Sequence, residues 1–137
     1  MLNFLTTILT YMQLISDKQH AQMKDSQMLQ TTHMVHSNKV AEITKRQTQE
    51  EAMVELKFDD EEISNEEYTQ IMDELSEIQD KYGNELTILA AKVSADEQTI
   101  QMRITAREPV LKQLQADLEN LEEAMDKDIE SEFTYCE

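Results

Sequence analysis

Residues 64–129, SNEEYTQIMDELSEIQDKYGNELTILAAKVSADEQTIQMRITAREPVLKQLQADLENLEEAMDKDI, carry the pattern that decides the fold. Apolar side chains recur there every three or four residues, with an average spacing of about 3.6 residues, the period of an α-helix. Only Asp96 and Arg107 interrupt the series. Its members are Tyr68, Ile71, Leu75, Ile78, Tyr82, Leu86, Leu89, Val93, Asp96, Ile100, Ile104, Arg107, Leu111, Leu114, Leu118, Leu121, Met125 and Ile129. The stretch predicts one long amphipathic helix whose apolar face is covered by other helices.

The rest of the chain has almost no residues that turn the backbone. One Gly and one Pro occur in 137 residues, and there is no Trp. A compact globule needs several turns, and turns need clusters of Gly, Pro, Asn or Asp. We therefore expect an all-α fold, a long antiparallel helical hairpin or coiled coil that is extended rather than globular and is completed by self-association. The predicted hairpin core is Ile71, Leu75, Ile78, Leu86, Leu89, Val93, Ile100, Ile104, Leu111, Leu114, Leu118 and Leu121.

The chain divides into four predicted segments. They are a near-neutral N-terminal helix over 1–58, an acidic corner over 59–64, a long acidic helix over 65–131 and a tail over 132–137. The long helix has weak points at Gly83 and Pro109, because glycine favours helix ends and proline removes a helical hydrogen bond. The apolar series keeps its phase through both, so we expect a continuous helix with a kink near Pro109 and Gly83 as the likelier hinge.

The start of the long helix has the most specific local signal. Ser64 precedes Glu67 by three residues, the spacing of a capping box, and Ile63 and Tyr68 stand at the two staple positions. The helix is predicted to begin at Asn65. The same residues partly match the end of a calcium-binding loop. The first two ligand positions would fall on Leu56 and Phe58, whose side chains cannot bind the ion, and the glycine of the sharp turn would be Glu61, which excludes calcium. The alternation Val54, Leu56, Phe58 is compatible with a strand, but no second strand could pair with it, so a last helical turn or an extended elbow is preferred.

Residues 1–16, MLNFLTTILTYMQLIS, contain no charged side chain. A signal peptide would need a basic start and a small-residue cleavage site, and a transmembrane helix would need a longer apolar run. The segment instead predicts an amphipathic helix that serves as a protein interface, with a membrane-surface anchor as the weaker alternative because flanking Lys and Arg are missing. The predicted assembly interface is Leu2, Leu5, Ile8, Leu9, Met12 and Ile15.

The net charge of −17 is spread unevenly. Residues 1–50 hold four acids and five bases, whereas residues 51–137 hold the other 25 acids and seven bases. Nucleic acid is therefore excluded as a partner. Charge repulsion keeps the acidic segment apart from its copies, so assembly contacts are expected in the N-terminal segment.

Residues that could bind metals do not form a site. Met1, Met12, Met23 and Met34 recur every 11 residues on one helix face, a pattern that adaptable packing explains. His33 and His36 share a face, but no second ligand pair accompanies them, so they are expected in solvent or in an interface. Cys136 is the single cysteine, which excludes an intrachain disulfide. We expect no metal and no cofactor.

No phosphate-binding loop and no nucleophile beside a base can be recognised, so the sequence does not predict an enzyme. The preferred hypothesis is a structural subunit that self-assembles into an oligomer or filament through its uncharged N-terminal helix. The alternatives are a helical adaptor or chaperone-like module for a protein partner, and a membrane-surface protein anchored by residues 1–16. Without a leader or a spanning segment, a cytoplasmic location or leaderless export is expected.

Overall fold

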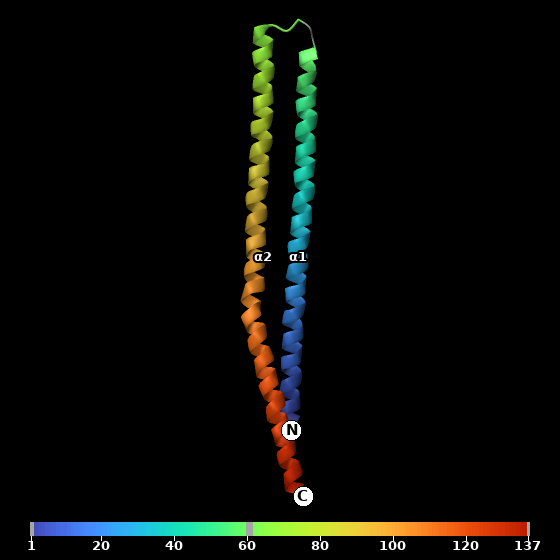
Figure 1. Ribbon diagram of the computed structural model, residues 1–137, viewed down its shortest axis with the longest axis vertical. Coiled ribbons are helices and arrows are strands. Elements are labelled where there is room, and N and C mark those ends of the chain that lie inside the picture. Colours follow the sequence, from blue (N-terminus) through green and yellow to red (C-terminus); the bar gives the residue numbers. More distant parts are fainter. Residues whose placement is uncertain (1, 60–61, 137) are drawn as a thin grey trace. The chain divides into compact units, whose positions relative to one another are not determined.

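The computed structural model describes residues 2–59 and 62–136 and is a helical hairpin (Figure 1). The elements in order are α1 (Leu2–Glu55), the short 3₁₀ helix η1 (Leu56–Asp59) and α2 (Asn65–Cys136). Within the described residues there is no strand, which confirms the all-α fold class. Side chains are described for these residues except Leu2, Asp59 and Thr134–Cys136.

Both helices run without interruption over their length. α1 contains neither glycine nor proline. α2 continues through Gly83 and Pro109, and Gly83 does not adopt a positive φ. The hydroxyl of Thr87 donates a hydrogen bond of 2.8 Å to the Gly83 carbonyl, as it can in a regular helix. Neither weak point therefore divides the predicted helix.

The connection between the helices is short. η1 follows α1 directly, at the residues where the sequence predicted a last helical turn or an extended elbow. Ser64 Oγ accepts a hydrogen bond of 3.2 Å from the Glu67 N–H, and α2 starts at Asn65. Such a cap satisfies one of the backbone donors that a helix start leaves unpaired. The Tyr68 ring contacts the Phe58 ring at a centroid distance of 5.7 Å and is 53% exposed, so it covers the connection rather than the hairpin core. Residues 60 and 61 of the predicted acidic corner lie outside the described residues.

The C-terminal end differs from the sequence expectation. α2 extends to Cys136, whereas a helix end at 131 and a separate tail were predicted. No Gly, Pro or Asn follows residue 131, so nothing in the local sequence stops the helix.

The chain forms two compact units. Unit 2 comprises residues 30–98, in which the two helices lie side by side and antiparallel around the connection. Four ion pairs define its register: Lys57–Glu74 at 2.9 Å, Glu50–Lys81 at 3.5 Å, Arg46–Glu85 at 3.2 Å and His33–Glu97 at 3.0 Å. The two residue numbers of each pair add up to 130 or 131, as expected for antiparallel helices in constant register. The buried side chains are Ile43, Ile71 and Tyr82.

Unit 1 comprises the described residues of 1–29 and 99–137. Its buried side chains are Ile8, Ile15, Asp25 and Ile100. Contacts between its helices include a hydrogen bond of 3.0 Å from Gln22 Nε2 to the Ile104 carbonyl and an approach of 3.6 Å from Arg103 Nη2 to Met28 Sδ. A buried aspartate in this position was not predicted from the sequence.

The inward face of α1 has a regular pattern that the apolar residues alone did not reveal. Buried or half-buried positions recur every three or four residues along the helix, but about half of them carry polar side chains. They include Phe4, Ile8, Tyr11, Ile15, Lys18, Gln22, Asp25, Leu29, Thr32, His36, Val40, Ile43, Gln47, Glu50 and Val54. The face of α1 that covers the apolar series of α2 is thus only partly apolar.

Candidate interaction surfaces

The predicted core residues of α2 all lie on its inward side. Ile71 and Ile100 are buried, at 6% and 4% exposure. Ten are half-buried: Leu75, Ile78, Leu86, Leu89, Val93, Ile104, Leu111, Leu114, Leu118 and Leu121. Two helices cover the apolar face of each other from one direction only, so a large part of the predicted core keeps contact with solvent.

The two interruptions of the apolar series have different structural roles. Asp96 is exposed. Its neighbour Glu97 is half-buried on the inward side of α2 instead, and forms an ion pair with His33. Arg107 is half-buried in unit 1, where its Nη1 donates hydrogen bonds to the carboxylate of Asp25 and to Gln22 Oε1. Arg107 therefore completes a polar cluster in place of an apolar contact.

The polar cluster of unit 1 is centred on Asp25, whose side chain is 9% exposed. Arg107 contacts one carboxylate oxygen, and Arg103 Nη2 lies 3.3 Å from the other. Gln22 accepts from Arg107 at 3.1 Å and donates to the Ile104 carbonyl. Each polar group of this cluster thus has a partner from the other helix. In some helix assemblies, buried polar networks of this kind specify the register of the helices rather than add to stability.

The predicted N-terminal interface is divided between two faces of α1. Ile8 and Ile15 are each 8% exposed and lie on the inward side, within unit 1. Leu5, Leu9 and Met12 point outward and are 45%, 57% and 51% exposed. The side chain of Leu2 lies outside the described residues. Ile8 and Ile15 thus lie in the hairpin core, whereas Leu5, Leu9 and Met12 lie on the exposed side of α1.

A second exposed apolar edge runs along the opposite margin of the α1 inward face in unit 1. It contains Leu14 and Met28, which are 42% and 46% exposed. The methionines that recur every 11 residues are also about half exposed, but they are not part of this edge. The exposed fractions of Met12, Met23 and Met34 are 51%, 53% and 60%. Helices that pack in four-helix arrangements carry apolar residues at such flanking positions as well as at the central ones.

The centre of unit 2 has different chemistry. Tyr82 is 1% exposed, and its hydroxyl donates a hydrogen bond to Glu50 across the two helices. This hydrogen bond lowers the pKa of Glu50, and the nearby charges of Lys81 and Arg46 act in the same direction against the desolvation of the carboxyl. The same contact raises the pKa of Tyr82, together with the desolvation of its hydroxyl by burial. The Lys81 ammonium lies 4.9 Å from the centroid of the Tyr82 ring.

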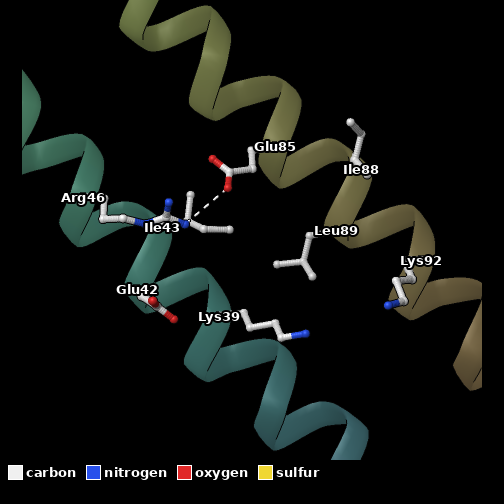
Figure 2. Close-up of a pocket in the computed structure, with 8 residues that line it drawn as sticks. All are labelled: Lys39, Glu42, Ile43, Arg46, Glu85, Ile88, Leu89 and Lys92. Atoms are coloured by element: carbon white, nitrogen blue, oxygen red, sulfur yellow. Dashed lines mark hydrogen bonds and ion pairs between the residues drawn. The ribbon is translucent and has the colours of Figure 1, made fainter.

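A shallow groove lies between α1 and α2 in unit 2 (Figure 2). Its floor is apolar, with Ile43 buried and Leu89 half-buried. Its margins are charged, and the groove is lined by Lys39, Glu42, Ile43, Arg46, Glu85, Ile88, Leu89 and Lys92. The groove cannot be predicted from the sequence, because its residues come from two distant segments of the chain and meet only through the register of the two helices.

Two further predicted features can be placed. Nδ1 of His36 is buried and has no hydrogen-bond partner. The described residues bring no three His, Cys, Asp or Glu side chains together as ligands for a metal ion. Over the same residues, no helix has a segment that is both long enough and apolar enough to cross a membrane.

Comparisons with protein-family models, with curated proteins and with solved structures find no match to this chain.

Proposed function

We propose that this chain is a structural, non-enzymatic subunit that self-assembles into an oligomer or filament, with contacts made by its N-terminal helix. The observation that carries the proposal is the amount of exposed surface. The chain exposes 10511 Å² at a mass of 16.0 kDa. A folded monomer of this mass exposes about 7,400 Å² by the usual scaling of surface with mass, so the excess is roughly 3,000 Å². Stable interfaces bury about 800 Å² per partner, and obligate ones bury more.

The exposed apolar residues of α1 supply a surface for this contact. Leu5, Leu9 and Met12 stand at positions i, i+4 and i+7 and thus share one face of the helix. Complete burial of such a side chain contributes about 1.5–3 kcal/mol of free energy. Because each of the three is about half exposed, burial in an interface would contribute roughly a further 3 kcal/mol in total. This contribution favours association when it is combined with further burial of the half-exposed core residues.

The charge distribution also favours a contact between copies at the N-terminal end of α1. Residues 1–16 contain no charged side chain, so two copies can approach there without repulsion. The exposed face of α2, in contrast, is rich in acids. A second hairpin that packs over residues 5–12 would add helices to the open side of unit 1 and complete a core of the kind found in helix bundles.

The test is the size of the full chain in solution, measured by sedimentation velocity over a wide concentration range. We expect species larger than a monomer whose fraction rises with concentration. Leu5→Asp/Met12→Asp places two charges on the exposed face and should shift the chain to monomer while the helical circular dichroism is retained.

The matched control is Asn3→Asp/Thr10→Asp, which adds the same charge at the same spacing on exposed positions of another face. It should assemble like the wild type. A wild-type chain that stays monomeric over the whole range would refute the proposal. Equal behaviour of the two double variants would refute the assignment of the surface.

A further inference from the structure

The groove of unit 2 has an uncompensated positive end. At one end, Arg46 and Glu85 neutralise each other through their ion pair of 3.2 Å. At the other end, Lys39 from α1 and Lys92 from α2 point toward one another on the same side of Leu89 (Figure 2). Neither lysine has an ion-pair partner among the residues that the structure describes. Two ammonium groups that face a common space repel each other, and a carboxylate between them would relieve this repulsion.

The apolar part of the groove lies next to this positive end. Ile88 is 71% exposed at the rim, and Leu89 forms the floor beside Ile43. The lining holds three cations and two acids, a net positive charge in a chain whose total is −17. An apolar groove with a cationic margin is suited to an amphipathic helix with an acidic face.

The C-terminal part of α2 carries such a face. Five exposed residues follow one another at steps of three and four on one side of the helix, and four of them are acidic. They are Glu119, Glu123, Asp126, Glu130 and Phe133. Phe133, at the end of the row, is 72% exposed, and large aromatic side chains are the usual anchors of protein interfaces.

We propose that the groove of unit 2 binds the acidic C-terminal face of α2 from a second copy of this chain. The carboxylates of that face contact Lys39 and Lys92, and the Phe133 ring covers Ile88 and Leu89. This inference rests on the proposed function, self-assembly, and adds a second contact to the apolar one at the N-terminal helix. The two surfaces of this contact differ, so each added copy offers a new groove and a new acidic face, and assembly leads to a filament when the rotation between copies does not close.

The first experiment reverses the charges in the full-length chain. Lys39→Glu/Lys92→Glu should weaken formation of the largest species by about 100-fold or more, because juxtaposed like charges cost several kcal/mol. Asp126→Lys/Glu130→Lys should have a similar effect. The chain that carries all four changes should recover assembly, since the signs are then opposite again. The matched control Lys24→Glu/Lys45→Glu changes the charge equally at exposed positions outside the groove and should assemble like the wild type.

Salt and an uncharged variant separate this contact from the apolar one. Rising ionic strength should dissociate the largest species, whereas the contact through Leu5 and Met12 should persist. Phe133→Ala leaves the charge unchanged and should weaken the groove contact by about tenfold.

The outcomes distinguish the two proposals. Normal assembly of Lys39→Glu/Lys92→Glu would overturn the groove contact and leave the N-terminal surface intact. Loss of assembly in this variant without recovery in the fourfold variant would show that something other than the acidic face occupies the groove, and would also overturn the inference. A monomeric wild-type chain would instead be a failure of the proposed function itself.

Discussion

Unit 1 and unit 2 are built from the same two helices but bury different chemistry. The centre of unit 1 is a carboxylate, Asp25, held between Arg103 and Arg107. The centre of unit 2 is the aromatic ring of Tyr82. The other buried side chains of this unit are Ile43 and Ile71. Burial of apolar surface stabilises a fold in proportion to area, whereas a buried ion pair gains little net energy because both charges lose hydration. We therefore expect unit 2 to contribute most of the stability and unit 1 to contribute mainly a specific register.

The same contrast extends to the surfaces. Unit 1 exposes apolar side chains such as Leu5 and Leu9, while the ion pairs of unit 2 lie at the margins of its helix pair, with Lys57, Lys81 and Arg46 all about half exposed. Marginal ion pairs of this kind contribute at most about 1 kcal/mol each. The stability of unit 2 thus depends on its few buried side chains.

The largest expected effect comes from removal of the buried charge in unit 1. Asp25→Ala should lower the free energy of unfolding by about 3 kcal/mol, because Arg107 is left half-buried without its counter-charge. Urea unfolding followed by circular dichroism at fixed protein concentration measures this loss. Asp17→Ala is the control, since Asp17 is exposed, and it should change stability by less than about 0.5 kcal/mol.

The double variant Asp25→Leu/Arg107→Leu sharpens the comparison. Replacement of a whole buried pair by apolar residues is often neutral or stabilising, so the double variant should unfold within about 1 kcal/mol of the wild type. A double variant as unstable as Asp25→Ala would mean that the pair itself stabilises unit 1, and the contrast between the units would be lost.

The next effect concerns the apolar centre of unit 2. Ile43→Ala should cost about 2–3 kcal/mol, the lower part of the range for buried isoleucine, because solvent can reach part of the site. Ile43 is 6% exposed, whereas Met53 on the same helix and outside the groove is 71% exposed, so Met53→Ala serves as the control with little effect on unfolding in urea. A loss below about 1 kcal/mol for Ile43→Ala would contradict an apolar origin of the stability of unit 2.

A smaller effect is expected for Tyr82→Phe, which keeps the ring and removes the hydroxyl that bonds Glu50. The pKa of Glu50 is lowered from 4.5 in the folded chain, mainly by this hydrogen bond. A carboxyl with a lowered folded pKa contributes stability above its unfolded pKa, and that contribution is lost as the pH falls through the folded value. In Tyr82→Phe the pKa of Glu50 should rise toward 4.5, and the loss of stability on acidification below 4.5 should become smaller.

NMR titration of the Glu50 side chain measures the first effect, and urea unfolding at a series of acidic pH values measures the second. Glu51→Gln is a suitable control, because Glu51 is bonded by Gln47 and not by Tyr82. An unchanged Glu50 titration in Tyr82→Phe would show that Lys81 and Arg46 set its pKa.

The smallest effect has the opposite sign. Gly83→Ala should stabilise by about 0.5–1 kcal/mol, since alanine loses less backbone freedom than glycine in a helix. An added Cβ at Gly83 meets no heavy atom within 4 Å, so nothing opposes the change. The midpoint of thermal unfolding measures it. A lower midpoint would indicate that Gly83 serves as a hinge, as the sequence had suggested.

Some of these features were predictable from single residues. The helical period of the apolar residues in α2 predicted which side of this helix faces inward. The acidic corner over 59–64 predicted a short connection between two helices. Arg107 was visible as an interruption, and an arginine on an otherwise apolar face requires an acid from the opposite helix. The acids of α1 are Asp17, Asp25, Glu42, Glu50, Glu51 and Glu55, so this signal could have narrowed the partner of Arg107 to six candidates.

The register of α1 against α2 could not be predicted from the sequence. The contacts that join the two helices could therefore not be predicted either. Ile8 and Ile15 could not be separated from Leu5, Leu9 and Met12, because all of these lie on the apolar side of one helix. Their separation depends on where α2 lies against α1. For the same reason the convergence of Lys39 and Lys92 was invisible, since they are 53 positions apart in the chain.

The sequence by itself determined that this protein is helical, because helix period, capping and the scarcity of turn residues are local properties that each segment expresses alone. It also determined which side of α2 is apolar. Only the tertiary structure decided which face of α1 turns inward, that Asp25 meets Arg107, and that Tyr82 meets Glu50. Those contacts depend on the register of two helices, and the register follows from the packing of many side chains at once.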